Sequence, residues 1–464
     1  MRYTIRHSGP APSTPAHGRD GLAWTNWART LTARPLRTAR PRSMEEIADA
    51  VRTAAEQDLP VRALGSGHSF TGTAATDGVA LDLSDWTGVV DVSGDLVTVR
   101  SGTTLRRLNA ELDRLGLAMA NLGDIDAQTV AGAISTGTHG TGARLGGLAT
   151  QVAGLELVLA DGSVLRCSEQ DDPDLLAAAR IGLGALGVIS TVTLRCVPAF
   201  VLAADERPMP VDEVLEGLSE FADGNDHFEF YWFPHGDRAL VKRNNRLPAG
   251  ERPRPLHPFR HHLEYRLLEN TALDLLCRAG RAVPALVAPL HRLSSHALSV
   301  RRYSDRSHRV FVTERRVRFV ETEWAVPREA AVDVLTELRA AVPRLEHPIA
   351  LPVEVRVCAA DDIWLSTAYG RETVYIAAHQ YLGMPYRHWF RTVESVCVAA
   401  GGRPHWGKLH GLNADRLRER YPRFDDFLRV RDRLDPGRRF RNAYTDRVLD
   451  GVTEPGDLDL DPRF

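Results

Sequence analysis

Apolar and polar positions alternate in short runs along the first part of the chain. The runs 79–83 and 96–99 have a period of two, which predicts β-strands, whereas apolar residues at helical spacing predict helices after Ser43 and over 104–115. The stretch 152–165 has the pattern of two strands joined by a polar turn, which is typical of a hairpin. Strands and helices mix here without the strict βαβ alternation of a Rossmann domain, so we expect an α+β fold.

The second half of the chain shows the same mixture in longer pieces. Strand-like runs occur at 228–233, 315–324, 350–358 and 373–381. Between and after them, the apolar spacing of 328–342 and of the segment that starts near Tyr386 predicts helices. We therefore expect a second α+β layer, which we call the cap domain.

The length of the chain, 464 residues, is too great for one ordinary core and indicates two domains. We expect the first domain over 21–200 and the cap domain over 201–402, with Pro208-Met209-Pro210 marking the crossover. The polar, proline-containing residues 1–20 are expected to form a flexible tail. Residues 403–464 should fold back onto the first domain.

Residues 249–300 have the pattern of an insertion in the cap domain. Apolar residues recur at helical spacing over 263–293, with Pro284 and Pro289 as expected breaks, and several arginines flank them. Docking on a membrane surface is one interpretation of this pattern. We favour an amphipathic helix pair packed on the cap domain, because most amphipathic helices face a core.

Composition excludes several classes of protein. The chain has 58 Lys and Arg against 60 Asp and Glu, so bulk charge does not favour nucleic acid as a partner. Its five cysteines are scattered and show no Cys-x-x-Cys spacing, which argues against a disulfide framework or a metal site and favours buried free thiols. The N-terminal residues lack the apolar core of a signal peptide, and we expect a cytoplasmic protein.

The most informative motif is Gly65-Ser66-Gly67-His68-Ser69-Phe70, which follows a short apolar run ending at Leu64. Two glycines allow positive φ and expose consecutive backbone N–H groups, which form a concave nest suited to a pyrophosphate. A plain phosphate loop needs no imidazole, so His68 indicates covalent attachment of a dinucleotide cofactor. The alternative is a tight turn with a surface histidine.

Three other segments add to this motif. The stretch 121–142 is rich in glycine and in small residues, which lets a chain pass close to a flat ring and a diphosphate. Pro352-Val353-Glu354-Val355-Arg356 and His405-Trp406-Gly407-Lys408-Leu409-His410 follow later in the chain. Together the four segments resemble, in order and spacing, the sugar-lactone and alditol oxidase branch of the vanillyl-alcohol-oxidase-type (PCMH-type) FAD flavoproteins, and most closely its aldonolactone oxidases.

The resemblance implies a PCMH-type FAD-binding domain with two α/β subdomains, plus an α+β substrate cap domain. It also implies that FAD is carried covalently by His68. The residues that it assigns to the cofactor are Leu64, Gly65, Ser66, Gly67, His68, Ser69, Gly123, Thr129, Gly132, Gly137, Thr138, His139, Gly140, Ile189 and His405.

Three charged residues are the candidate catalytic groups. Glu354 and Arg356 are two positions apart, so on a strand they point to one face, and Lys408 adds a second cation. By resemblance all three contact the substrate. We expect Arg356 and Lys408 to hold the reacting hydroxyl and to stabilise charge on the reduced flavin, while Glu354 orients them or accepts a proton. The alternative is a plain same-face ion pair.

Thr129 and His379 occupy positions that face the substrate in the related alditol oxidases. Those enzymes have a different residue at the position of His379. The expected reaction is oxidation of the C2 hydroxyl of an aldono-1,4-lactone, of the L-gulono or D-arabinono type, by hydride transfer to flavin N5. Oxygen is the expected acceptor and gives peroxide, because oxidases of this family tend to carry glycine at the position of Gly123.

Three other functions stay open. An alditol oxidase acting on a polyol shares every motif, a dehydrogenase would use another acceptor, and a non-catalytic flavoprotein would not need Glu354, Arg356 and Lys408 together. The insertion favours lactones over alditols, since the related alditol oxidases lack one.

Overall fold

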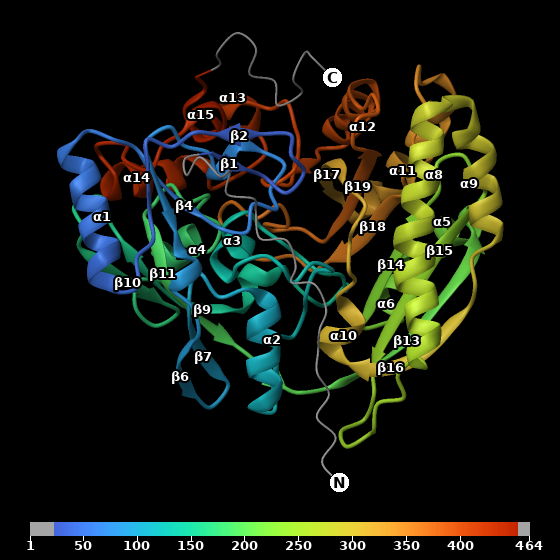
Figure 1. Ribbon diagram of the computed structural model, residues 1–464, viewed down its shortest axis with the longest axis horizontal. Coiled ribbons are helices and arrows are strands. Elements are labelled where there is room, and N and C mark those ends of the chain that lie inside the picture. The colour runs from blue at the N-terminus through green and yellow to red at the C-terminus, as the bar shows by residue number, and fades with distance from the viewer. Residues whose placement is uncertain (1–22, 453–464) are drawn as a thin grey trace.

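The computed structural model describes residues 23–452. The predicted tail, residues 1–20, lies outside these residues. Figure 1 shows two bodies side by side, with the N-terminal segments on the left and the large sheet of the second half on the right. The mixture of strands and helices confirms the α+β prediction.

A three-stranded parallel sheet, ordered β3-β5-β4, begins the first body. Its strands are β3 (Arg37–Ala39), β4 (Val61–Leu64) and β5 (Val79–Asp82). Helix α1 (Met44–Glu56) packs on it through the face predicted from apolar spacing, with Ile47 and Val51 fully buried. Ser43 caps this helix by accepting a hydrogen bond from the Glu46 N–H.

A five-stranded antiparallel sheet, ordered β10-β9-β11-β7-β6, completes the core of this body. Its strands are β6 (Val89–Ser93), β7 (Leu96–Arg100), β9 (Val152–Val158), β10 (Val164–Ser168) and β11 (Val188–Arg195). The predicted hairpin is confirmed as β9 and β10. The helices beside it are α2 (Leu105–Arg114), α3 (Val130–Ser135) and α4 (Pro173–Ala179). Two short pairs are β1 (Trp24–Thr25) with β2 (Thr32–Ala33), and β8 (Leu117–Ala118) with β12 (Val197–Pro198).

One eight-stranded antiparallel sheet, ordered β16-β13-β15-β14-β18-β19-β17-β20, forms the second body. Its strands are β13 (Val201–Pro210), β14 (His227–Trp232), β15 (Arg238–Arg246), β16 (Arg301–Arg306), β17 (Phe319–Pro327), β18 (Val353–Cys358), β19 (Thr373–Tyr381) and β20 (Arg403–Pro404). Its helices are α5 (Val211–Glu216), α6 (Leu218–Asp223), α10 (Ser307–Phe311), α11 (Ala331–Ala341) and α12 (Arg387–Ala399). The segment 208–210, expected to mark the crossover, ends strand β13 instead, because its residues pair with β15.

The insertion 249–300 lies between β15 and β16. It contains α7 (Pro258–His261), a π-helix (His262–Ala272), α8 (Leu273–Ala282) and α9 (Val287–His296). Cys277 and Val287 pack with Leu351 and Tyr381 of the cap domain, which confirms the packed helix pair. Pro289 does not break a helix as expected: it lies in the first turn of α9, where proline is tolerated.

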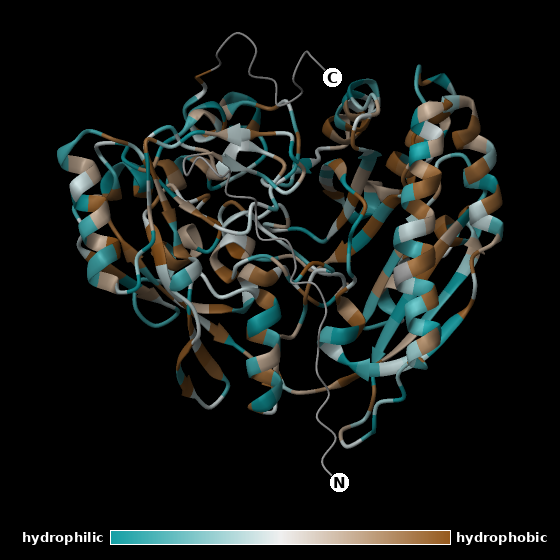
Figure 2. Cartoon of the chain, viewed as in Figure 1, coloured by the Kyte–Doolittle hydropathy of each residue, from teal (hydrophilic) through white to brown (hydrophobic). Residues whose placement is uncertain are grey.

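Hydrophobic and hydrophilic residues alternate along α8 and α9 in Figure 2. Some apolar side chains on the insertion remain exposed, among them Phe259, Leu275 and Leu293. Within residues 23–452 no helix combines the length and the apolar character needed to span a bilayer.

The last segment connects both bodies. After β20 the Gly407 carbonyl accepts a hydrogen bond from the Phe70 N–H at 2.8 Å, beside the glycine-rich loop of the first body. Further on, the Arg439 carbonyl accepts from the Val61 N–H of β4 at 2.8 Å. The helices of this segment are α13 (Ala414–Arg418), α14 (Phe424–Leu434) and α15 (Ala443–Thr445).

Candidate active site

Two cavities adjoin each other: the larger lies between the two bodies, whereas the smaller is lined by the first body and by Phe440 of the last segment. The larger holds about 1130 Å³ of empty space and the smaller about 930 Å³. They share His68, Ser69, Gln128 and Thr136 in their walls. Each has the size of a typical small-molecule site, and together they form one elongated space with His68 at the junction.

The smaller cavity runs along the glycine-rich loop 64–69. Gly67 has φ +68°, a conformation that favours glycine. Three buried donors in its wall, on Trp24, Arg62 and Ser101, have no hydrogen-bond partner among the described residues. A concave loop and unused buried donors suit a diphosphate and its sugars, so this part of the chain fits the ADP half of FAD.

His68 is held as a neutral imidazole. Its ring stacks on Trp27, with centroids 5.5 Å apart and planes 22° from parallel. Burial, with added repulsion from Lys408 and Arg318, lowers the pKa of His68 to about 4. A neutral imidazole keeps a free electron pair, which a nucleophilic attachment to a cofactor requires.

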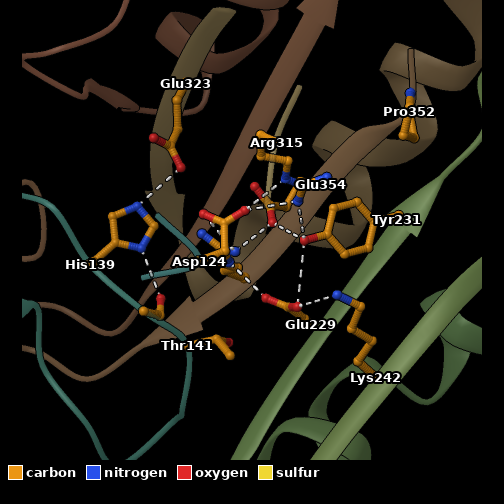
Figure 3. Close-up of polar contacts among 12 residues, drawn as sticks. Asp124, His139, Thr141, Glu229, Tyr231, Lys242, Arg315, Glu323, Pro352 and Glu354 are labelled. Carbon is orange, nitrogen blue, oxygen red and sulfur yellow. Dashed lines mark hydrogen bonds and ion pairs between the residues drawn. The ribbon is translucent and has the colours of Figure 1, made fainter. Parts of the chain in front are cut away.

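Two antiparallel strands of the cap sheet supply the floor of the larger cavity. In the register of β14 and β18, Glu229 lies opposite Arg356, and Tyr231 lies opposite Glu354. Glu229 accepts a hydrogen bond from Arg356 Nε at 2.8 Å, Tyr231 donates to Glu354, and Arg356 Nη2 lies 2.6 Å from Glu354. Figure 3 shows Glu229, Tyr231 and Glu354 converging, with Lys242 beside Glu229. The cross-strand register thus joins Glu354 and Arg356 to two groups that sequence spacing alone does not connect.

Asp124 and Arg315 close this set from two loops. Arg315 donates to Asp124 from Nε at 3.2 Å and from Nη2 at 2.8 Å, and Nη2 also lies 3.2 Å from the Tyr231 hydroxyl. Burial tends to raise the pKa of Asp124, but Arg356 and Arg315 outweigh it, so this pKa lies well below its usual range. The set is formally neutral, with three carboxylates (Asp124, Glu229, Glu354) and three cations (Lys242, Arg315, Arg356).

Burial raises the pKa of Glu354, although Arg356 opposes this shift. Its neighbour Glu229 behaves differently: burial is outweighed by Arg356 and Lys242, and the pKa of Glu229 falls to about 2. Two carboxyl groups in one site whose pKa values are pushed apart are suited to different roles, and Glu354 is the better proton acceptor.

Lys408 is held by a second set of charges on β17 and β19. Its Nζ lies 2.5 Å from Glu321, and the same carboxylate lies 3.5 Å from His379 Nε2. Burial tends to lower the pKa of Lys408, but Glu321 and Glu323 outweigh it and raise this pKa. Lys408 therefore stays an ammonium group, which can donate hydrogen bonds but cannot act as a base.

His139 is also paired with a carboxylate. Its Nδ1 lies 2.9 Å from the Gly140 carbonyl. Its Nε2 lies 3.0 Å from Glu323, and Figure 3 shows this pair. His139, Glu323 and His405 bring possible metal ligands within 4.8 Å of one another. Glu323 also lies 4.0 Å from the Lys408 Nζ, so this carboxylate has a histidine and an ammonium group as neighbours.

The structure separates the predicted residues into two groups. Glu354, Arg356, His379 and Lys408 line the larger cavity, as do Gly123, Thr138, His139 and His405. The residues that line the smaller cavity are Leu64, Gly65, Ser66, Gly67, Thr129, Gly132 and Ile189, while His68 and Ser69 line both.

Four positions differ from the expectation. Thr129, expected to face the substrate, lines the smaller cavity, where it caps α3 by accepting from the Gly132 N–H at 3.2 Å. Gly137 and Gly140 are in the wall of neither cavity. Gly123 was expected to favour oxygen as the acceptor, but a methyl group added there would lie 3.0 Å from the His139 carbonyl, so backbone packing also favours glycine at this position.

Several site residues were missed from the sequence. They are Asp124, Glu229, Tyr231, Lys242, Arg315, Glu321 and Glu323. A signal was present for four of them: Glu229 and Tyr231, and Glu321 and Glu323, are spaced by two within apolar strands. Charged or polar residues at alternate positions of a buried strand need partners, and such partners are frequently part of a site.

Comparison with known proteins agrees with this geometry. The model of an FAD-binding domain matches residues 35–168, and that of D-arabinono-1,4-lactone oxidase matches residues 192–448. A solved solvent-stable cholesterol oxidase has the same fold, with a TM-score of 0.78 at 19% identity over 92% of this chain and 97% of its own. The protein is therefore an FAD-dependent oxidoreductase with the fold of the PCMH-type flavoproteins.

Curated relatives indicate which family of FAD-dependent oxidoreductases the chain resembles. An L-gulono-1,4-lactone dehydrogenase of Mycobacterium tuberculosis is 46% identical over 92% of this chain and 99% of its own. An L-gulonolactone oxidase of Bos taurus is 35% identical, over 93% and 99%. An alditol oxidase of a Streptomyces species is 32% identical, over 92% and 99%. Given the length of the family match, the chain belongs to the D-arabinono-1,4-lactone oxidase family.

Proposed function

We propose that this enzyme oxidises the C2 hydroxyl of an aldono-1,4-lactone of the L-gulono or D-arabinono type. The observation that carries the proposal is the larger cavity, where Glu354, Arg356 and Lys408 face one space that also reaches His68. The names of the family model and of the relatives from Mycobacterium tuberculosis and Bos taurus support a lactone as the substrate.

FAD, when bound, supplies the acceptor for the hydride from C2. In our proposal Arg356 and Lys408, both cationic, donate hydrogen bonds to the reacting hydroxyl and fix its orientation. Glu354 Oε1 is used by Tyr231 and Arg356, whereas Oε2 has no partner among the described residues and can accept the hydroxyl proton. The set of three carboxylates and three cations around Glu354 is formally neutral. Proton uptake by Glu354 would give this set one positive charge, which would stabilise negative charge on the reduced flavin ring.

The acceptor and the cofactor linkage are also part of the proposal. We propose oxygen as the acceptor, with release of hydrogen peroxide, and a covalent bond between His68 and FAD. The name of the Bos taurus relative supports an oxidase. The name of the Mycobacterium tuberculosis relative supports the second candidate, a lactone dehydrogenase with another acceptor. Gly123 alone does not decide between them, since backbone packing already favours glycine there.

A substrate and acceptor panel tests these proposals. L-gulono-, L-galactono- and D-arabinono-1,4-lactone are compared with xylitol and sorbitol, first in air with peroxide detection and then without oxygen with a soluble dye acceptor. Lactone turnover with stoichiometric peroxide is the expected result. Turnover only with the dye would indicate the dehydrogenase, and a higher kcat/KM for xylitol would indicate the alditol oxidase that the Streptomyces relative supports.

We also propose a cytoplasmic location. All five cysteines are free and buried, which is the usual state of thiols in a reducing compartment. Fractionation of the producing cells, with activity followed in the soluble and membrane fractions, checks this proposal; activity in washed membranes would instead support docking through the insertion.

A further inference from the structure

Asn270, in the π-helix of the insertion, holds the backbone on both sides of Arg315. Its side chain donates to the Glu314 carbonyl at 2.9 Å and accepts from the Arg316 N–H at 2.8 Å. It also donates to the Tyr265 carbonyl at 2.7 Å, and it is only 5% exposed. The buried amide thus fixes the position from which the Arg315 side chain leaves the chain.

Arg315 reaches the larger cavity with unused donors. Its Nε and Nη2 bind Asp124, and Nη2 also contacts Tyr231. Nη1 makes no hydrogen bond to any residue that the structure describes, and the side chain is 32% exposed in the cavity wall. Two N–H groups of a fixed, planar cation are therefore available to a molecule in the cavity.

Asp124 links the guanidinium group of Arg315 to that of Arg356. Its second oxygen lies 3.6 Å from Arg356 Nη2, so one carboxylate bridges Arg315 and Arg356. The two cations line the same cavity. When Arg356 holds the reacting hydroxyl, we expect the substituent of the adjacent carbon to lie near Arg315. In an aldono-1,4-lactone that substituent is a carbonyl oxygen, which can only accept hydrogen bonds.

We propose that Arg315, positioned by Asn270, binds the carbonyl oxygen of the lactone and makes the insertion a specificity element for lactones over alditols. This inference rests on the proposed lactone substrate. A fixed pair of charged donors suits an oxygen in the plane of a ring, whereas the corresponding hydroxyl of a flexible polyol is also a donor and can turn towards other partners.

The test compares Arg315→Met with Arg316→Met in the full-length, FAD-loaded enzyme. Methionine keeps most of the length of the side chain but removes the donors. Arg316 is the matched control, because it is the next residue, is 47% exposed and pairs with Glu314. Steady-state kcat/KM is measured with L-gulono-1,4-lactone and with xylitol, together with flavin absorbance and the melting temperature.

For Arg315→Met we expect kcat/KM for the lactone to fall about 10- to 100-fold, the scale of one charge-assisted hydrogen bond, with a much smaller loss for xylitol. Most of the fall should appear in KM and in the affinity for lactone measured by perturbation of the flavin spectrum. Asn270→Ala should give a smaller loss with the same selectivity, and Arg316→Met should leave both substrates unchanged.

Equal losses for lactone and xylitol in Arg315→Met would overturn the inference while leaving the proposed function intact. If the wild-type enzyme oxidises xylitol but no lactone, the proposed function fails first, whatever the variants do. Should Arg315→Met lose its flavin, Arg315→Lys gives the same comparison, because it keeps the charge beside Asp124 but lacks the planar fork; unchanged lactone selectivity in that variant would also refute the role of the guanidinium.

Discussion

Removal of one hydroxyl group, in Tyr231→Phe, tests whether Glu354 is the proton acceptor. Phenylalanine fills the same space on β14, so the change removes a hydrogen bond to Glu354 without opening a cavity. The lost donor had favoured the ionised carboxylate. The pKa of Glu354, already raised by burial, must therefore rise further in the variant.

The size of the effect follows from this contact. A hydrogen bond to a charged group contributes about 1.5–3 kcal/mol. Because one pH unit corresponds to about 1.4 kcal/mol, the acid limb of the kcat/KM profile should move up by about one to two pH units. Above that limb Glu354 is ionised in both proteins, and their rates should converge.

The assay is the pH dependence of kcat/KM, supported by the rate of flavin bleaching by substrate without oxygen. Glu229→Gln is the matched comparison: the Glu229 charge helps to raise the pKa of Glu354, so its removal should move the acid limb to lower pH. Opposite displacements cannot arise from general loss of packing. An unchanged acid limb in Tyr231→Phe, or movement of both variants in one direction, would refute the role of Glu354.

Three further predictions concern other parts of the site. In His68→Ala the denatured protein should no longer fluoresce at full mass on a gel, whereas the wild type should; wild-type flavin that is freed completely by acid would disprove the covalent bond. Glu321→Gln removes the main charge that raises the pKa of Lys408, so the alkaline limb of kcat/KM should move to lower pH, and an unmoved limb would exclude Lys408 as the titrating donor. Gly123→Ala should slow reoxidation by air more than anaerobic reduction by substrate; equal slowing together with a lower melting temperature would indicate the contact with His139 instead.

The sequence predicted the elements of the fold better than the partners of the site. Strand β19 has the bounds predicted for the strand-like run 373–381. The helix predicted over 104–115 is α2, and Gly116 follows it with a φ of +72°. Local patterns of this kind depend on neighbours within one element. The proline segment 208–210 was misjudged, because pairing with β15 outweighed the local signal of a linker.

The candidate site was predicted in part for a similar reason. Spacing along one strand connects Glu354 with Arg356, but it carries no information about the register with β14 that brings Glu229 and Tyr231 opposite them. Arg315 is still harder to predict, since its position depends on Asn270, 45 residues earlier and in a different element. Long-range register and side-chain clamps of this kind appear only once the chain is folded.

The hydrogen bonds of the C-terminal segment to the first body have a consequence for biosynthesis. The ribosome synthesises β4 long before the residues that bind it. The Val61 N–H donates to the Arg439 carbonyl, and the Arg62 side chain donates to the Phe440 carbonyl. Asn442 then donates to three carbonyls between residues 72 and 75. We therefore expect the nascent first body to stay incomplete until translation is almost finished, and the cofactor, whose cavity includes Phe440, to be loaded after synthesis.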